Sequence, residues 1–365
     1  MILFFVATGI QVVFFLLYLI AFSKTPRPRA DSDHNTPISV IVCAHNEEKN
    51  LRELVPMLLE QQYPEYEVVV VVDRSDDHSY DFLLATSGKD SRLRFVTIDH
   101  TPERMNAKKY ALTLGIKTAK NPIILLTDAD CRPASPRWIH AMTAGFDDKT
   151  QFVLGYSPYY KSSGLLGLFI RFETLLTGMQ YIGMALLGMP YMGVGRNLAY
   201  RRSLFMENKG FNDLMEVTGG DDDLFVNRHA RRHNTRVSLG NEALMYSVPK
   251  MTWRSFLRQK VRHLSAGKRY RAQHKVMSAL FNLSYIVSWG VGISLLALLP
   301  DFYWPVGVIL LGRSFVMGYI AWRAAKRLGD SVELWPFVIL DFVYVFYYIS
   351  TGLRALITKK VRWTN

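Results

Sequence analysis

Long apolar stretches occupy both ends of this 365-residue chain, and a segment of mixed polarity lies between them. A bilayer crossing takes about 20 helical residues. Four stretches reach that length, at 2–22, 277–299, 304–322 and 334–356. The pattern predicts four regions in chain order: a transmembrane anchor (1–23), a globular domain (24–250), an amphipathic interface helix (251–275) and a membrane region with about three spans (276–365).

Within the globular domain, short runs of β-branched residues alternate with amphipathic segments. Three helices are expected to begin near residues 47, 80 and 105, and four strands are expected at 38–43, 68–72, 94–98 and 122–127. Strands that alternate with helices indicate a doubly wound, mostly parallel α/β sheet. Sheets of this kind bind their ligands at the carboxyl ends of the strands.

Residues 164–189 interrupt this alternation. They are apolar and dotted with glycine, but they include Arg171 and Glu173. Charged side chains inside a membrane span are unfavourable. A helix that lies on the membrane surface or lines a substrate groove fits the segment better than a span.

Basic residues beside the apolar stretches predict an orientation. The first stretch lacks the basic start and the cleavage site of a signal peptide, so it is expected to remain as an anchor. Basic clusters follow it at 24–29 and separate the last two stretches at 323–327, which places the globular domain in the cytoplasm. Four crossings would put the basic tail at 359–362 outside. Either one stretch does not cross, or the tail departs from the positive-inside tendency.

The formal net charge of +13 has a simple explanation in the membrane. Much of the positive charge lies beside the apolar stretches, where anionic lipid headgroups attract it. The sequence has neither a zinc-finger spacing nor an RNA-binding signature, so no nucleic-acid partner is expected. Only two cysteines are present, Cys43 and Cys131. Their positions argue against a disulfide framework and fit a reducing cytosol.

The most informative motif is the pair Asp128 and Asp130, which closes the apolar run at 122–127. Side chains at i and i+2 of an extended backbone point to the same side. The two carboxylates therefore repel each other unless a cation or a proton intervenes. A divalent metal that carries a diphosphate would resolve the conflict. A strand end followed by a turn explains the same residues equally well.

Other charged residues stand where strands end and helices begin. Asp73 closes the second strand, and we expect it to accept a hydrogen bond from a base or ribose while Asp77 caps the next helix. Lys108 and Lys109 lie early in a helix, where positive charge opposes the helix dipole. A solvated lysine pair is the default expectation, and a nearby anion is the alternative.

Two glycine-containing segments come later in the domain. The segment 193–200 would let a ligand approach the backbone, but it is too short to specify a nucleotide. Gly219 and Gly220 precede three aspartates at 221–223, at the start of an expected helix. Helix capping explains acids at this position. Three acids after two glycines exceed that need and would supply a general base for a hydroxyl acceptor.

The expected interface helix carries Gln259 and Arg262 three residues apart, on one face. Arginine suits bidentate binding of phosphate. The many basic residues around it also suit a helix that lies on anionic lipid. The two interpretations are compatible.

Seven segments, in this order, resemble the membrane-bound, inverting family-two glycosyltransferases: 38–51, 71–77, 108–112, 127–133, 195–201, 220–224 and 259–267. The resemblance implies a nucleotide-sugar-binding sheet of the GT-A type. It also implies a metal-dependent hexosyltransferase that inverts the sugar. The donor would be a nucleoside-diphosphate sugar, with a UDP-sugar as the first expectation, and the cofactor would be Mg2+ or Mn2+.

The resemblance further implies roles for residues near the donor. Glu47 and Asp73 would contact the nucleotide, and Lys108 would lie with them in the donor site. Asp128 and Asp130 would form the Asp-x-Asp pair of the family, with Asp130 as the metal ligand.

The later motifs correspond to the base and to a closing segment. Asp221 or Asp222 would activate the acceptor; the motif reads Gly-Asp-Asp-Asp instead of beginning Glu-Asp, so its register is open by one residue. Gln259, Arg262 and His263 would occupy the Gln-x-x-Arg-Trp segment that closes over the diphosphate and acceptor. His263 replaces the usual tryptophan, which puts the expected stacking contact in doubt.

Several functions stay open. A single-transfer enzyme that acts on a membrane lipid is favoured, because a processive polysaccharide synthase needs a pore and four apolar stretches are few for one. A non-catalytic membrane scaffold would only bind nucleotide sugar. A sugar nucleotidyltransferase would be expected to have a glycine-rich loop after its first strand, where residues 44–47 read Ala-His-Asn-Glu.

The last two apolar stretches each contain one charged residue, Arg313 and Asp341. The two lie at similar depth if the helices run antiparallel. Charges inside a membrane usually pair or line a polar path, so we expect an Arg313–Asp341 ion pair.

Overall fold

The computed structural model describes residues 1–23, 36–217, 219–331, 333 and 335–357. The predicted basic clusters at 24–29 and 359–362 lie outside these residues.

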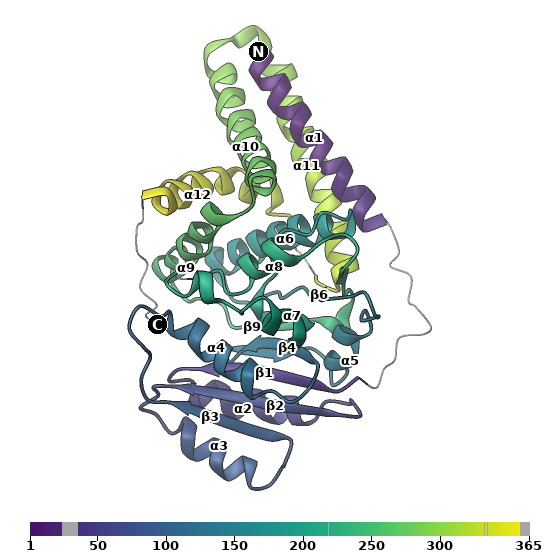
Figure 1. Ribbon diagram of the computed structural model, residues 1–365. Helices are drawn as coiled ribbons and strands as arrows, with labels where there is room; N and C mark the ends of the chain where they lie inside the picture. The colour runs from purple at the N-terminus through teal and green to yellow at the C-terminus, as the bar shows by residue number, and fades with distance from the viewer. Residues whose placement is uncertain (24–35, 218, 332, 334, 358–365) are drawn as a thin grey trace.

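A seven-stranded sheet forms the centre of the globular domain (Figure 1), in the order β3-β2-β1-β4-β7-β6-β8. Its strands are β1 (Ile38–Ala44), β2 (Tyr66–Asp73), β3 (Leu93–Ile98), β4 (Ile123–Asp128), β6 (Phe152–Leu154), β7 (Leu198–Arg201) and β8 (Thr235–Val237). The first four run parallel to their neighbours, and β7 is antiparallel to both β4 and β6. The predicted mostly parallel α/β sheet is confirmed.

The register of the central strands brings their polar ends together. Cys43 of β1 pairs with Val71 of β2 and with Asp128 of β4. The chain therefore leaves β1, β2 and β4 at the same edge of the sheet, as the parallel arrangement requires. The residues before this edge are buried on both faces, which explains the unbroken valine run of β2.

Helices cover both faces of the sheet. They are α2 (Glu48–Leu59), α3 (Ser79–Ser87), α4 (Ala107–Thr118), α5 (Trp138–Thr143), α7 (Arg202–Glu207) and α8 (Asp223–His229). In α4, a Cβ at Gly115 would lie 2.8 Å from the side chain of Ile41. This glycine lets α4 pack directly on β1. A second, two-stranded sheet pairs β5 (Cys131–Pro133) with β9 (Met245–Ser247), next to the acidic pair.

Four helices are long and apolar enough to cross a membrane: α1 (Ile2–Ser23), α10 (Ala272–Leu298), α11 (Tyr303–Leu328) and α12 (Phe337–Ile357). In Figure 1, α1, α10 and α11 project from the globular domain as one bundle. In contrast, α12 lies across the base of that bundle and packs against α9 (Trp253–Ala266).

A buried ion pair joins α11 and α12. The guanidinium Nη1 of Arg313 lies 2.7 Å from Asp341 Oδ2, and neither side chain is more than 1% exposed. Arg313 Nε also donates to the side chain of Gln11 in α1. The predicted Arg313–Asp341 pair is confirmed.

Helix α6 (Gly164–Leu186) corresponds to the interrupted apolar segment. It lies between the sheet domain and the membrane bundle (Figure 1), and most of its residues are buried. The expectation of a helix on the membrane surface is wrong, because protein covers α6 from both sides. Thr174, Thr177 and Tyr181 of α6 line a pocket, which agrees with the groove alternative. Arg171 and Glu173 instead form ion pairs with Glu333 and Lys260.

Candidate active site

A pocket lies where the sheet edge, α6 and α9 meet. Ten residues were given a role in the site by the resemblance, and seven of them line the pocket: Lys108, Asp128, Asp221, Asp222, Gln259, Arg262 and His263. Segments more than 100 residues apart in the chain thus converge on one opening. The other three, Glu47, Asp73 and Asp130, are held at the neighbouring strand ends, outside the described lining of this pocket.

Lys108 joins the two acidic motifs. Its Nζ lies 3.0 Å from Asp128 Oδ1 and 3.5 Å from Asp221 Oδ2. Burial alone would lower the pKa of Lys108, but the charges of Asp128 and Asp221 raise it well above its ordinary value. The lysine is therefore a permanent cation between two carboxylates.

The expectation of a solvated lysine pair is wrong. The neighbouring Lys109 is fully buried, and its Nζ donates to the backbone oxygens of Val217 and Gly219. The side chain of Asn106 caps α4 by accepting the Lys109 N–H. Positive charge is tolerated at the start of this helix because acids and carbonyl groups surround it.

The three consecutive aspartates have different environments. Asp222 caps α8: its Oδ1 accepts the Asp223 N–H at 2.8 Å, and its Oδ2 accepts the Gly195 N–H at 2.5 Å. Asp223 accepts a hydrogen bond from the Tyr270 hydroxyl at 2.8 Å. Asp221 faces Lys108 across the pocket. Of the three, Asp221 is the one turned toward a cation in the opening.

Their pKa values diverge for the same reasons. Burial raises the pKa of Asp221, but Lys108 and Lys109 outweigh burial and hold it below its ordinary value. Burial and the charge of Asp221 raise the pKa of Asp222. Burial and the charge of Asp222 raise the pKa of Asp223 well above its usual range. Opposite shifts among adjacent carboxylates are typical of sites that move protons.

The glycines near these acids allow backbone conformations and close contacts that a larger residue would prevent. Gly219 and Gly220 have φ values of +76° and +75°, a region that other residues rarely adopt. At Gly195, a Cβ would lie 3.2 Å from Asp222 Oδ2. The glycine of segment 193–200 thus lets its own N–H reach Asp222.

An acidic edge lies beside the pocket, formed by Asp128, Asp130 and Glu47. Burial and then the charge of Asp128 raise the pKa of Asp130. Burial is also the main cause of the raised pKa of Glu47, with Asp130 adding to it, and Asn50 donates to Glu47 at 2.6 Å. These pKa values are raised partly because the carboxylates lie close together and repel one another. A bound cation would reduce that repulsion.

The acidic edge suits Mg2+ or Mn2+, because both prefer oxygen ligands. Among the described residues, no group of three or more His, Cys, Asp or Glu side chains is arranged to hold a metal ion. Mg2+ is usually held by one or two carboxylates together with the phosphates of a substrate, and Asp128 and Asp130 are carboxylates of that kind.

The acids after β2 are already engaged within the protein. Asp73 is buried and accepts two hydrogen bonds from Arg74, at 2.8 and 2.9 Å. Asp77 accepts the N–H of Ser79 at the start of α3 and the N–H of Glu48 at the start of α2. His78 occupies the N-cap position of α3, so Asp77 lies one residue before the cap position and accepts the first helical N–H from there. The proposed contact between Asp73 and a nucleotide stays a prediction.

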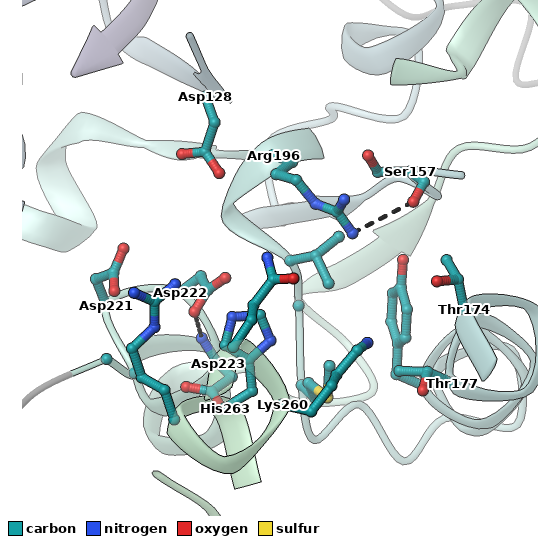
Figure 2. Close-up of a pocket in the computed structure, with 18 of the residues that line it drawn as sticks. Asp128, Ser157, Thr174, Thr177, Arg196, Asp221, Asp222, Asp223, Lys260 and His263 are labelled. Atoms are coloured by element: carbon teal, nitrogen blue, oxygen red, sulfur yellow. Dashed lines mark hydrogen bonds between the residues drawn. The ribbon is translucent and has the colours of Figure 1, made fainter. Parts of the chain in front are cut away.

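One wall of the pocket was not found from the sequence. Figure 2 shows Ser157, Thr174 and Thr177 on the side opposite Asp221, with Arg196 between them and Asp221; Tyr156 and Tyr181 also line the pocket. The sequence predicted a groove for the α6 segment as one alternative, but it singled out none of these α6 residues because the segment reads as apolar. Arg196 lies in the glycine segment, which had no chemistry assigned to this side chain.

Residues 39–208 match the family described as "Glycosyl transferase family 2". The chain is 26% identical over 247 residues to "Probable glycosyltransferase YdaM" of Bacillus subtilis (strain 168), which covers 65% of this chain and 56% of that protein. It is 27% identical over 144 residues to 4,4'-diaponeurosporenoate glycosyltransferase of Staphylococcus haemolyticus (strain JCSC1435), which covers 39% and 36%. The matches span about half or less of these relatives' own length.

A solved structure has the same fold. It is described as "Mannosyltransferase PcManGT from Pyrobaculum calidifontis in complex with GDP-Man and Mn2+", and the match covers 98% of both chains with a TM-score of 0.62 at 17% identity. At this identity the likeness shows the fold alone, and it supports the GT-A-like sheet with attached helices.

Proposed function

We propose that this chain, whose residues 39–208 match glycosyl transferase family 2 and which has four candidate membrane helices, transfers a sugar from a nucleoside-diphosphate donor to a hydroxyl of a membrane lipid, with inversion. The observation that carries the proposal is the single opening shared by Asp128 and Asp221, with Lys108 between them. One acid belongs to the expected donor edge and the other to the expected acceptor motif.

The donor would bind at the acidic edge. Asp130, with Asp128, would hold Mg2+ or Mn2+ together with the diphosphate, and the ion would stabilise the charge that develops on the leaving diphosphate. Lys108 and Arg262 line the same opening and add positive charge there. The structure described as PcManGT contains GDP-Man and Mn2+, so GDP-sugars belong beside UDP-sugars in any test of the donor.

Asp221 would act as the general base. Lys108 and Lys109 keep its carboxylate ionised, whereas both oxygens of Asp222 accept backbone N–H groups. The proton of the acceptor hydroxyl moves to Asp221 as the hydroxyl oxygen attacks the anomeric carbon. The bond from that carbon to the diphosphate oxygen breaks, and the configuration inverts. Asp222 acts as a positioning residue that fixes Gly195 and the start of α8.

We infer a cytoplasmic location of the domain from the basic residues that border the apolar stretches in the sequence, at 24–29 and 323–327. Arg327 at the end of α11 donates to the backbone oxygen of Phe22 near the end of α1, at 3.2 Å, so both helices reach the domain at one level.

The test is transfer from a panel of radiolabelled UDP- and GDP-sugars to lipid by the protein in membranes, with Mg2+, with Mn2+ and after chelation. We expect one donor to label a lipid product of one added sugar, and chelation to stop it. A ladder of products would favour a processive synthase instead. Binding of donor without transfer or hydrolysis would indicate a scaffold.

A further inference from the structure

Four residues that line the pocket carry a buried polar atom without a hydrogen-bond partner among the described residues: Thr174 Oγ1, Arg196 Nη1, Asp223 Oδ1 and Gln259 Oε1. Asp223 belongs to the acidic motif already described, and the other three belong to the rest of the pocket wall. An unsatisfied buried polar group costs about 1–3 kcal/mol. Three such atoms around one opening indicate that a polar ligand completes their hydrogen bonds.

The neighbouring polar groups of the wall are already satisfied. The Tyr181 hydroxyl donates to the Gly155 oxygen at 2.7 Å, and the Ser157 hydroxyl donates to the Met245 oxygen at 2.5 Å. Lys260 forms an ion pair with Glu173. The unpartnered atoms come from three separate elements, namely α6, the turn after Val194, and α9. They are therefore not one local defect.

The chemistry of the three atoms matches hydroxyl groups. Arg196 Nη1 only donates, Gln259 Oε1 only accepts, and the Thr174 hydroxyl does both. A ring with several hydroxyls can donate to one and accept from another. An acyl chain would leave all three atoms unpaired, and a phosphate would meet the carbonyl oxygen of Gln259.

Arg196 does not require an anionic ligand. Its guanidinium lies 4.6 Å from the ring centre of Tyr159, and the acidic edge already provides negative charge from Asp128 and Asp130. Its free nitrogen thus acts as a directed donor.

The position of these three atoms in the pocket indicates that they bind the acceptor. In Figure 2, Thr174 lies on the far side of Arg196 from Asp221, and α6 separates the sheet from the membrane bundle in Figure 1. We propose that this end of the pocket is a subsite for a polyhydroxylated ring of the acceptor, so that the acceptor carries a sugar, either as a glycosylated lipid or as a glycan. The assignment to an acceptor rests on the proposed function.

The test begins with binding, because binding does not depend on catalysis. The full chain in phospholipid nanodiscs is titrated with maltose and chitobiose and followed by saturation-transfer NMR. Thr174→Val keeps the shape of the side chain and removes the hydroxyl, and Arg196→Lys keeps the charge and removes Nη1. Thr143→Val is the matched control, because it removes a buried threonine hydroxyl in α5, which bonds only within its own helix.

One lost hydrogen bond corresponds to about 0.5–1.5 kcal/mol, or about two- to twelvefold in affinity. We expect Thr174→Val and Arg196→Lys to weaken disaccharide binding by about fivefold, and Thr143→Val to leave it unchanged. In transfer assays the same two variants should raise the acceptor KM by a similar factor. The KM for the donor and the rate of donor hydrolysis without acceptor should stay the same.

Glycosylated diacylglycerol and free maltose then distinguish the two sources of the ring by their KM values. The subsite is overturned if the wild-type protein binds neither disaccharide, if Thr174→Val changes the donor KM instead of the acceptor KM, or if bare diacylglycerol is used as well as its glycosylated form. Absence of any donor turnover with disaccharide binding intact would overturn the proposed function and leave the ring subsite standing.

Discussion

The protein buries charge in two places, and the two differ in whether the charged side chains face an opening. In the membrane region, Asp341 Oδ2 accepts hydrogen bonds from Arg313 at 2.7 Å, Ser314 at 2.7 Å and Trp289 at 3.3 Å. The Arg313 guanidinium lies between aromatic rings, 4.7 Å from the centre of Tyr285. This cluster holds α10, α11 and α12 to one another.

In the pocket, one cation is shared by two carboxylates, and some polar atoms have no hydrogen-bond partner in the described part of the chain. Lys108 serves two carboxylates at once, and adjacent acids have pKa values shifted in opposite directions. Four residues that line the pocket carry a polar atom that lacks a partner among the described residues. The comparison teaches that burial of a charge does not by itself indicate function. The membrane cluster stabilises the fold although Arg313 Nη2 and Gln11 Nε2 have no partner among the described residues, because it is closed in by helices. The pocket cluster faces an opening and is therefore accessible to a ligand.

The sharpest test of this contrast is Asp130→Ala. We expect turnover to fall by about three orders of magnitude, because stabilisation of a leaving group by a metal is worth several kcal/mol. The melting temperature should not fall, since removal of Asp130 relieves crowding with Asp128. Initial transfer rates and thermal unfolding measure the two effects. Wild-type turnover in this variant would remove the metal from the mechanism.

Two variants, Asp221→Asn and Asp222→Ala, distinguish the general base from the positioning residue. Loss of a general base lowers kcat by about 10²–10⁴, and we expect this for Asp221→Asn. Its stability should also fall at neutral pH, because Lys108 and Lys109 lose the charge that holds the pKa of Asp221 below its ordinary value. Asp222→Ala should lower the free energy of unfolding by about 1 kcal/mol through loss of the helix cap, with a smaller loss of kcat. The reverse ranking of the two kcat values would assign the base to Asp222.

A double-mutant cycle at Arg313 and Asp341 tests the structural cluster. Removal of one partner leaves a buried charge and should destabilise the protein by about 3–5 kcal/mol. The double Ala variant should lose little more than either single variant. Unfolding of the purified protein in detergent measures the cycle, and the kcat of the folded fraction should be unaffected. Fully additive losses would show that the two residues act independently.

The smallest expected effect is the pH dependence of Asp223→Asn. The pKa of Asp223 in the folded protein lies above its ordinary value of 3.8, so the folded state binds this proton more tightly than the unfolded state does. Its contribution favours folding below pH 3.8 and is lost as the pH rises through the raised pKa. Asp223→Asn should therefore be more stable than wild type at neutral pH, with an advantage that shrinks on acidification. A melting-temperature difference that grows toward acidic pH would contradict this.

Much of the candidate site was predictable because parallel strands bring their carboxyl ends to one edge. The alternation of strands and helices placed Glu47, Asp73 and Asp128 at that edge before any coordinates were known. That Asp221 and Arg262 line the same pocket was expected only because the motifs occur in the order found in a known family. The local periodicity of the sequence does not determine how far apart in space such segments lie.

By itself, the sequence determined the type of sheet, the apolar helices and the residues able to carry charge, because periodicity and residue chemistry are local properties. Only the tertiary structure decided that Lys109 is buried, that α12 lies across the bundle, and that Thr174 and Arg196 face one opening. Each of these depends on contacts between segments that are more than 100 residues apart in the chain. Several tertiary folds have the same local pattern of helices and strands, and these long-range contacts select one of them.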